Sequence, residues 1–353
     1  MKLGILTFHL GQNHGGYLQV WCLQTYLKSL GHKVEVINYQ NVHHEKHEIF
    51  RPWIYRRPFK LWKAWEKHRA FQKAFKKLNL SSHTTNVCDV DWNAYDAVII
   101  GSDVVWDFAW DRLGHDPVYF GHFGCAYRGQ IIPYAPSIGA MAPNVEIPVW
   151  VTEGLLKMHS LCARDTATAT MVKRACGREA PLVVDPTWLD ISYQKPSITK
   201  KKRLVVYAYY IDKSIANSII TYARRHGLEI ISLGYYHSWA DFNFHALSPL
   251  DWEDYLRESE VMVAGTFHGT LYAIRSQCRF VTVMNDRIYS RVTHALSLAG
   301  LTEHATSDPS QLAPIMDRRP VYSEVIEHLQ PSVEFSRNYL LNGLAQAQDD
   351  LDI

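Results

Sequence analysis

The chain has 353 residues, of which 47% are hydrophobic and 12% aromatic, so it can bury the cores of two domains of ordinary size. Its formal net charge of +2, from 37 basic and 35 acidic residues, gives no overall field of the kind that attracts nucleic acid, and we expect no nucleic-acid partner. Six cysteines without a C-x-x-C pair form neither a disulfide framework nor a zinc site, which favours the reducing cytoplasm.

The first elements along the chain predict a parallel βαβ unit. Residues 2–8 (KLGILTF) have the pattern of a buried strand, residues 17–31 that of a helix, and residues 33–39 (KVEVINY) that of a second strand. The opening lacks the long apolar region of a signal peptide, and no apolar run approaches the ~20 residues that span a membrane. We therefore expect a cytoplasmic protein, with any membrane contact peripheral and at the inner face.

Residues 51–77 form a basic and aromatic segment with ten Lys or Arg residues, seven aromatic residues and one acidic residue, Glu66. One interpretation is a helix that lies on an anionic membrane surface or near a lipid-linked acceptor. The other is an amphipathic helix whose lysines are solvated and whose aromatic residues pack on its own domain. The aromatic residues concerned are Trp62, Trp65, Phe71 and Phe75.

Strands and helices continue to alternate along the rest of the chain. In the N-terminal part, further strands are predicted at the start of 95–107 and 129–140, and again within 161–165 and 181–190. Residues 192–203 have the composition of a linker. A second βα series follows, with strands expected at 204–210, 229–235, 261–265 and 279–285, and 310–353 is expected to be mainly helical.

This order predicts an α/β fold of two doubly wound Rossmann-like domains that face each other across a cleft. The N-terminal domain is expected at 1–195, on the acceptor side, with a helical insert at about 51–77. The C-terminal domain is expected at 200–305, on the donor side, followed by a helical tail at 310–353 that could cross back to the N-terminal domain. Such sheets bind ligands at the carboxyl ends of their strands.

Four glycine-bearing loops follow predicted strands, at 11–17, 101–107, 137–140 and 265–270. Their backbone N–H groups can approach an anion, so such loops suit phosphate or carboxylate. None matches G-x-G-x-x-G or the P-loop, so neither a dinucleotide nor an NTP held by a Walker lysine is supported. In the last loop, GTFHGT, His268 stands at a strand-to-helix turn, where an imidazole either exchanges protons with a substrate or braces the turn.

Five segments occur in an order that is shared with a known family. They are NHGGYLQVWCLQTYLKSLGHKVEVINY (13–39), GSDVVWD (101–107), YAPSIG (134–139), VVDPTWL (183–189) and GTFHGTLYAI (265–274). Together they resemble the polysaccharide pyruvyl transferases, which move a pyruvyl group from phosphoenolpyruvate onto a sugar as a pyruvate ketal, and 290–301 is similar to an arginine-led segment of that family. The resemblance implies a GT-B-like architecture with the donor between the domains, and it places the catalytic histidine at His268.

The resemblance also implies how the donor is held. Some members bind it with an arginine two residues before the histidine, where this chain has Thr266. Arg164 matches an arginine of the corresponding family segment, and Arg291 and Arg287 are further candidates for binding the donor carboxylate or phosphate. The residues whose turns are expected to offer N–H groups to the anion are Asn13, Gly15, Gly16, Gly269 and Thr270.

Pyruvyl transfer predicts that His268 is the general acid and base, with Asp103 as a second base or as the group that orients an acceptor hydroxyl. The scheme requires no metal, and no cofactor besides phosphoenolpyruvate as co-substrate. Plainer roles stay open for three of the polar residues. Asp103 could cap a helix, Asp185 could organise a turn, and Arg164 could form an ion pair with Asp165.

Two short patterns mimic metal sites, and we expect neither to bind a metal. Residues 43–47 (HHEKH), with His43, His44 and His47, are expected in a solvated loop, and residues 89–91 (DVD) in a polar connection. Several aromatic residues suit either stacking on sugar rings or a core. They are Trp106, Trp110, Tyr235, Tyr236 and Trp239.

The expected partners are phosphoenolpyruvate and a sugar or lipid-linked oligosaccharide acceptor of exopolysaccharide biosynthesis. Two other functions remain open from the sequence. One is a GT-B-type glycosyltransferase that uses a nucleotide sugar on the same scaffold. The other is a non-catalytic partner in polysaccharide assembly, for which the basic aromatic segment would be the active part.

Overall fold

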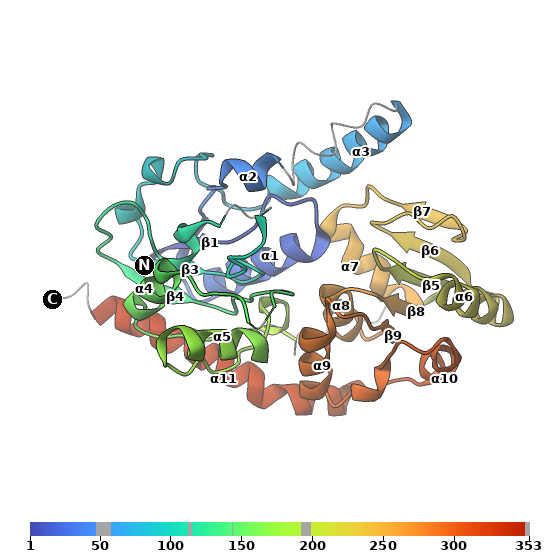
Figure 1. Ribbon diagram of the computed structural model, residues 1–353. Coiled ribbons are helices and arrows are strands. Elements are labelled where there is room, and N and C mark those ends of the chain that lie inside the picture. Colours follow the sequence, from blue (N-terminus) through green and yellow to red (C-terminus); the bar gives the residue numbers. More distant parts are fainter. Residues whose placement is uncertain (47–57, 112–114, 143, 192–198, 350–353) are drawn as a thin grey trace. The chain divides into compact units, whose positions relative to one another are not determined.

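The computed structural model describes residues 1–46, 58–111, 115–142, 144–191 and 199–349 (Figure 1). The chain divides into two compact units, and each is described by itself. Unit 1 comprises Met1–Arg56, Phe75–Asp190 and Ser332–Ile353, and unit 2 comprises Arg57–Ala74 and Ile191–Pro331. Unit 2 thus includes most of the basic aromatic segment, and the end of the helical tail belongs to unit 1.

Unit 1 contains a four-stranded parallel sheet with the order β2-β1-β3-β4. Its strands are β1 (Lys2–Leu6), β2 (Lys33–Val36), β3 (Ala97–Ile100) and β4 (Gln130–Pro133). The central strand β3, AVII, is buried along its whole length, as continuous apolar strands of parallel sheets are. The helices of this part are α1 (His14–Ser29), α2 (Val42–Glu45), α4 (Val149–Lys157) and α5 (Thr166–Cys176).

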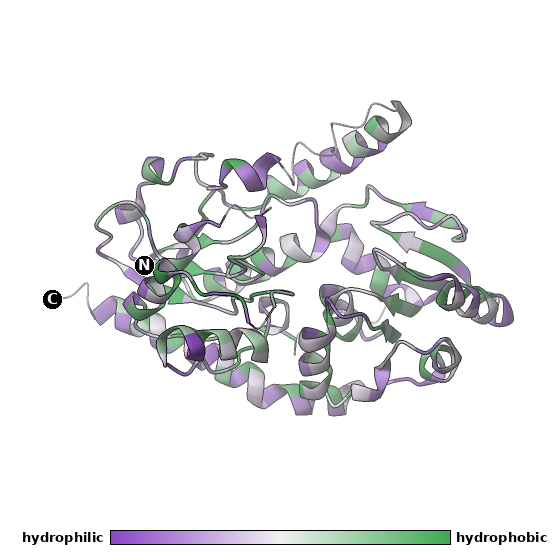
Figure 2. Ribbon diagram, viewed as in Figure 1, coloured by the Kyte–Doolittle hydropathy of each residue, from purple (hydrophilic) through white to green (hydrophobic). Residues whose placement is uncertain are grey.

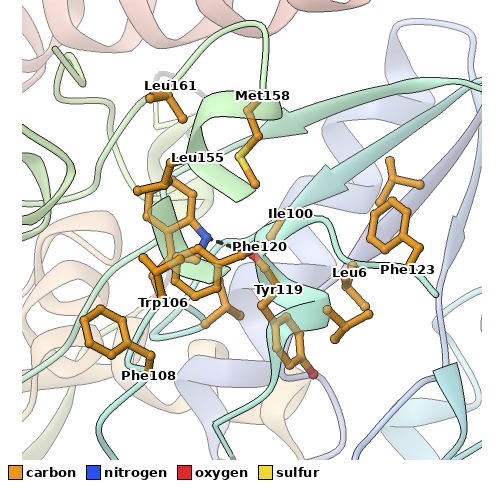
Figure 3. Packing of buried hydrophobic residues seen from close by; sticks show 14 of the residues in the cluster. Leu6, Ile100, Trp106, Phe108, Tyr119, Phe120, Phe123, Leu155, Met158 and Leu161 are labelled. Atoms are coloured by element: carbon orange, nitrogen blue, oxygen red, sulfur yellow. Dashed lines mark hydrogen bonds between the residues drawn. The ribbon is translucent and has the colours of Figure 1, made fainter. Parts of the chain in front are cut away.

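Large aromatic side chains fill the core of unit 1 (Figure 3). Trp106 is 0% exposed, its indole N–H donates to the carbonyl of Tyr119 at 2.9 Å, and its ring stacks on Phe120 at 5.5 Å. Because the side chain is fully buried and its polar atom is hydrogen-bonded, Trp106 is a core residue, and the alternative of sugar stacking is wrong for it.

Two of the strands predicted for the N-terminal part do not form. Between residues 161–165 and 181–190, β pairing is reduced to an isolated bridge between Ala163 and Leu182, and a 3-10 turn, η7 (Pro186–Trp188), follows. Pro181 and Pro186 lack the N–H group that a strand would donate, which shortens the ladder to this bridge.

Unit 2 contains a six-stranded parallel sheet with the order β10-β9-β8-β5-β6-β7. Its strands are β5 (Lys201–Tyr207), β6 (Glu229–Leu233), β7 (Phe242–Phe244), β8 (Ser259–Ala264), β9 (Arg279–Val283) and β10 (Ala305–Thr306). Lys201 and Arg203, which were expected in a linker, begin β5, and both pair with Glu258. Residues 192–198 of that linker lie outside the described residues.

The helices that complete the structure follow the predicted periodicity. They are α3 (Pro58–Phe75), α6 (Lys213–His226), α7 (Pro249–Arg257), α8 (Phe267–Arg275), α9 (Tyr289–Leu298), α10 (Leu312–Asp317) and α11 (Tyr322–Asp349). Figure 2 shows apolar residues concentrated in the strands of both sheets, while the helices alternate between polar and apolar positions. Among the described helices, none combines the length and the hydropathy that a membrane span requires.

Candidate functional site

The loop before α1 in unit 1 ends in a side-chain cap. Asn13 precedes the helix, and its Oδ1 atom accepts the backbone N–H groups of Gly15 at 2.9 Å and Gly16 at 3.3 Å. These two N–H groups, which were expected at an anion, are therefore engaged within the loop. A Cβ atom on Gly16 would lie 3.5 Å from Oδ2 of Asp103, so the Asp103 carboxylate lies against the first turn of α1.

Arg164 lies at the centre of a buried ion cluster. The residue is 3% exposed, its Nη1 atom is 2.9 Å from Oδ2 of Asp185, and its Nη2 atom is 3.5 Å from Oδ1 of Asp103. Nη1 also donates to the hydroxyl of Ser102 at 3.3 Å. One guanidinium thus contacts two carboxylates, and in this arrangement Arg164 orients the side chains of Asp103 and Asp185. The role of Arg164 in holding phosphoenolpyruvate stays a prediction.

The neighbouring residue Asp165 has a separate role. It caps α5, where its Oδ1 atom accepts from the N–H group of Thr168 at 2.9 Å and from the Thr168 hydroxyl at 2.7 Å. Its Oδ2 atom accepts from the hydroxyl of Ser137 at 2.6 Å. The ion-pair alternative for Arg164 is thus correct in kind, but its partners are Asp185 and Asp103 instead of Asp165.

Asp185 joins the cluster to a turn, as the plainer alternative for it predicted. Its Oδ1 atom accepts from the N–H group of Thr187 at 3.0 Å and from the Thr187 hydroxyl at 2.9 Å. Its other oxygen pairs with Arg164. One carboxylate therefore fixes both the 3-10 turn and the orientation of the guanidinium.

Asp103 is a partly exposed carboxylate in an unusual backbone conformation. It follows β3 with a φ of 74°, a left-handed conformation that costs a non-glycine residue about 1–3 kcal/mol. Its Oδ1 atom accepts from the N–H group of Val104 at 2.9 Å, and no helix of the described chain begins there, so the helix-cap alternative is not realised. Its side chain is 16% exposed, so the carboxylate reaches solvent while Arg164 orients it. This arrangement suits a general base or a hydroxyl acceptor.

In unit 2, the loop between β8 and α8 is closely packed. Thr266 is the N-cap of α8, and its hydroxyl oxygen accepts the N–H group of Gly269 at 3.0 Å. A Cβ atom on Gly269 would lie 3.0 Å from Cδ1 of Tyr207, so glycine allows α8 to approach β5. The hydroxyl of Thr270 is buried 2.9 Å from that of Thr282 on β9. Gly269 and Thr270 therefore position the helix, and the N–H group of Gly269 is engaged by the cap.

His268 lies in the first turn of α8, 9% exposed, with its ring centroid 5.3 Å from that of Phe267. The guanidinium of Arg291, on α9, lies over the Phe267 ring, with its central carbon 5.5 Å from the ring centroid. Nη2 of Arg291 donates to the carbonyl of Arg287 at 2.8 Å, whereas the Arg287 side chain is exposed. Of the three predicted arginines, Arg291 is the one that shares a ring contact with the helix carrying His268.

Exposed tyrosines gather at the carboxyl ends of strands in unit 2. Tyr209 and Tyr210, which follow β5, are 76% and 74% exposed, and Tyr236, which follows β6, is 64% exposed. The apolar pattern predicts a strand over 204–210, but β5 ends at Tyr207, so Tyr209 and Tyr210 lie beyond it. Tyr235 and Trp239 are half-buried, and Trp110 in unit 1 is 43% exposed.

The two patterns that mimic metal sites serve local packing. His44 is buried with its ring 4.4 Å from that of Phe8, so it is not the solvated residue that was expected, and His47 lies outside the described residues. Asp89 accepts from the Thr84 hydroxyl and the Asn86 amide in a polar turn. The described ranges contain no group of three or more His, Cys, Asp or Glu residues that could hold a metal ion.

Comparison with known proteins gives one family match and several structural matches. A family model described as polysaccharide pyruvyl transferase matches residues 13–287. No curated protein matches the chain. Among solved structures, a putative UDP-N-acetylglucosamine 2-epimerase from Listeria monocytogenes has a TM-score of 0.56 at 8% identity, with 97% of this chain and 94% of that chain covered.

Two further structures have the same architecture. A UDP-GlcNAc 2-epimerase from Neisseria meningitidis, bound to UDP-GlcNAc, has a TM-score of 0.51 at 7% identity and covers 98% of this chain and 100% of its own. A glycosyltransferase involved in avilamycin A biosynthesis has a TM-score of 0.51 at 11% identity and covers 99% and 98%. At these identities the likeness shows the fold alone. The prediction of an α/β, GT-B-like fold with two Rossmann-like domains is confirmed.

Proposed function

The chain belongs to the polysaccharide pyruvyl transferase family, and we propose that it transfers the pyruvyl group of phosphoenolpyruvate to a sugar hydroxyl pair. The product is a pyruvate ketal on a cell-surface polysaccharide or on its lipid-linked precursor. The observation that carries this proposal is the placement of His268 in the first turn of α8, where both His268 and Arg291 contact the ring of Phe267. A proton-transfer group and a cation that contact the same ring suit an anionic enol ester as donor.

The proposed chemistry balances without another reactant. His268 delivers a proton to the methylene carbon of phosphoenolpyruvate, and the adjacent carbon becomes an oxocarbenium-like centre. One sugar hydroxyl adds to this centre and loses its proton, phosphate leaves with its bonding electron pair, and a second hydroxyl closes the ketal and loses a second proton. One of these two protons restores His268, and the other leaves with the released phosphate. Proton transfer by a well-placed group typically contributes about 10²–10⁴-fold to the rate.

Charged groups in each unit have distinct proposed roles. In unit 2, Arg291 binds the carboxylate or phosphate of the donor, which would supply the cation that Thr266 does not. In unit 1, Asp103 orients an acceptor hydroxyl and accepts its proton, held in position by Arg164. Tyr209 and Tyr210, on the carboxyl side of β5, offer exposed rings on which an acceptor sugar can stack.

Calorimetry and phosphate release together test the proposal. We expect phosphoenolpyruvate to bind the wild type, and Arg291→Ala to weaken that binding by at least about tenfold, as the loss of a charge-assisted hydrogen bond does. His268→Ala should retain binding and lose at least about 100-fold in acceptor-dependent phosphate release. Arg225→Ala, at an exposed position in the last turn of α6, is the matched control for Arg291→Ala.

A nucleotide-sugar donor is the outcome that would contradict the proposal. If UDP-sugars bind while phosphoenolpyruvate does not, the chain uses the same scaffold for glycosyl transfer. If neither donor binds and His268→Ala has no effect on polysaccharide production in cells, a non-catalytic role in assembly takes its place.

A further inference from the structure

Helix α3 of unit 2 exposes one continuous face. The exposed residues recur at intervals of three and four, which places them on one side of a helix. We call them the α3 stripe: Trp62, Trp65, Arg69, Gln72 and Lys73, continued by Lys76 just beyond the helix. Trp62 and Trp65 are 52% and 44% exposed. The stripe therefore has two indole rings toward its N-terminal end and basic side chains toward its C-terminal end.

The large apolar residues of α3 differ in how deeply they are buried. Phe71, Ala74 and Phe75 are 0%, 1% and 5% exposed and belong to the buried side of the helix. Phe71 and Phe75 are therefore buried, as the second interpretation predicted, whereas Trp62 and Trp65 remain about half exposed. The Trp62 ring lies 6.5 Å from that of His245 and the Trp65 ring lies below the Arg69 guanidinium, so each ring is held by a neighbour while part of its surface stays open to solvent.

The charges around the stripe are mainly positive. Helix α3 has five Lys or Arg residues and a single acidic residue, Glu66. Oε2 of Glu66 lies 3.0 Å from Nε2 of His245, whose ring centroid is 6.5 Å from that of Trp62, so the one carboxylate of the helix lies at the edge of the stripe and is paired there with His245. The guanidinium carbon of Arg69 lies 4.7 Å from the centroid of the Trp65 ring. Arginine and tryptophan thus share one exposed surface, on which the basic side chains outnumber this single carboxylate.

We propose that the α3 stripe binds the surface of an anionic membrane. Tryptophan is the side chain that prefers the headgroup level of a bilayer, because its ring is apolar and its N–H group remains hydrated. Each Lys or Arg close to an anionic surface strengthens binding about fivefold. Arg69, Lys73 and Lys76 supply three such residues on the side of the helix that carries Trp62 and Trp65. This surface contact is independent of pyruvyl transfer, although it would concentrate the protein where lipid-linked acceptors reside.

Sedimentation with lipid vesicles tests the contact on the full chain. The probe vesicles contain 30% phosphatidylglycerol and 70% phosphatidylcholine, with pure phosphatidylcholine as the neutral reference. We expect the wild type to sediment with the anionic vesicles at 0.1 M salt and to be released at 1 M salt, because the Debye length falls from about 10 Å to about 3 Å. Binding to the neutral vesicles should be at least about tenfold weaker.

Charge-reversal variants locate the binding surface. Arg69→Glu/Lys73→Glu should lower the partition coefficient on anionic vesicles by at least about tenfold. The matched control is Arg224→Glu/Arg225→Glu, which makes the same change in net charge at two exposed positions on α6. This control should bind as the wild type does apart from a small general effect of net charge.

Aromatic variants test the second part of the stripe. Trp62→Ala/Trp65→Ala should weaken binding at least about tenfold, because two interfacial rings are lost. The matched control is Phe335→Ala/Leu341→Ala, which removes two exposed apolar side chains of α11, 46% and 42% exposed. Circular dichroism confirms that each variant is folded. The proposal is overturned if the wild type does not sediment with anionic vesicles at 0.1 M salt, or if both stripe variants bind these vesicles as strongly as their controls do.

Discussion

At the scale of single residues, the ion cluster around Arg164 combines stability with function. Its guanidinium faces Asp185, whose side chain is 1% exposed, and Asp103, whose side chain is 16% exposed. Removal of the cation would leave two carboxylates without their counterion, one of them in the interior. An intact buried ion pair contributes little to the free energy of unfolding, but a buried charge that has lost its partner destabilises the protein by several kcal/mol.

Arg164→Ala should therefore lower the free energy of unfolding by about 3–5 kcal/mol, measured as a shift of the urea midpoint. Arg164→Met/Asp185→Asn, which removes the most buried charge as well, should recover part of that loss. Arg164→Lys keeps the positive charge but should still be less stable than the wild type, because an ammonium group cannot bind both carboxylates as the planar guanidinium does. If Arg164→Ala leaves the urea midpoint unchanged and affects only donor affinity, Arg164 binds the donor after all.

At the scale of elements, the packing of α8 on β5 depends on the absence of a side chain at Gly265. A Cβ atom there would lie 2.5 Å from Cβ of Ala208 and 3.2 Å from its Cα atom, so backbone would have to move. Gly265→Ala should cost about 1–3 kcal/mol, the usual penalty of overpacking, and displace the first turn of α8 with His268. The midpoint temperature of thermal unfolding and the rate of phosphate release would then both be lower.

The compensating variant separates packing from other causes. Gly265→Ala/Ala208→Gly removes the methyl group that clashes and should restore most of the stability and activity that Gly265→Ala loses. Thr266→Ala, which removes the cap while it keeps the glycine, should cost about 1 kcal/mol, and Thr266→Ser should restore it. If the double variant is no better than Gly265→Ala, the contact with Ala208 does not determine the position of α8.

The elements that could be predicted are those whose hydrophobic residues recur at a clear helical or strand period. Helices α1 and α6 and the buried strands β1 and β3 have apolar patterns long enough to be recognised without tertiary contacts. Strand β7 (Phe242–Phe244) has three residues and exists because β6 offers a free edge, which no local pattern reveals.

The sequence can name candidate site residues, but it cannot show the contacts that each of them makes. The sequence identifies His268, Asp103 and Arg164 as candidates through motifs, and it also suggests that Arg164 forms an ion pair. It cannot show that the pair joins Arg164 to Asp185, because residues 21 positions apart meet only in the folded chain. The same holds for Arg291, whose place over Phe267 depends on how α9 packs against α8.

At the scale of the whole molecule, two buried histidines make stability depend on pH. Burial lowers the pKa of His9 in unit 1 and of His237 in unit 2 below the ordinary value of 6.5. Nδ1 of His9 lies 3.0 Å from the carbonyl oxygen of Thr7, and Nε2 of His237 lies 3.0 Å from that of Ala208. Burial outweighs these carbonyl contacts, which by themselves favour the protonated ring, so each histidine takes up a proton less readily in the folded state than in the unfolded chain, where it does so around pH 6.5.

Because the unfolded state binds more protons in this range, the contribution of these residues is complete above pH 6.5 and is lost as the pH falls below it. We expect a lower urea midpoint at pH 5.5 than at pH 7.5. His9→Asn/His237→Gln replaces each ring with an amide that can donate to the same carbonyl but cannot take up a proton, so the difference between the two pH values should shrink. A difference as large as that of the wild type would place the acid sensitivity in other groups, with the neutral state of His9 and His237 making no measurable contribution.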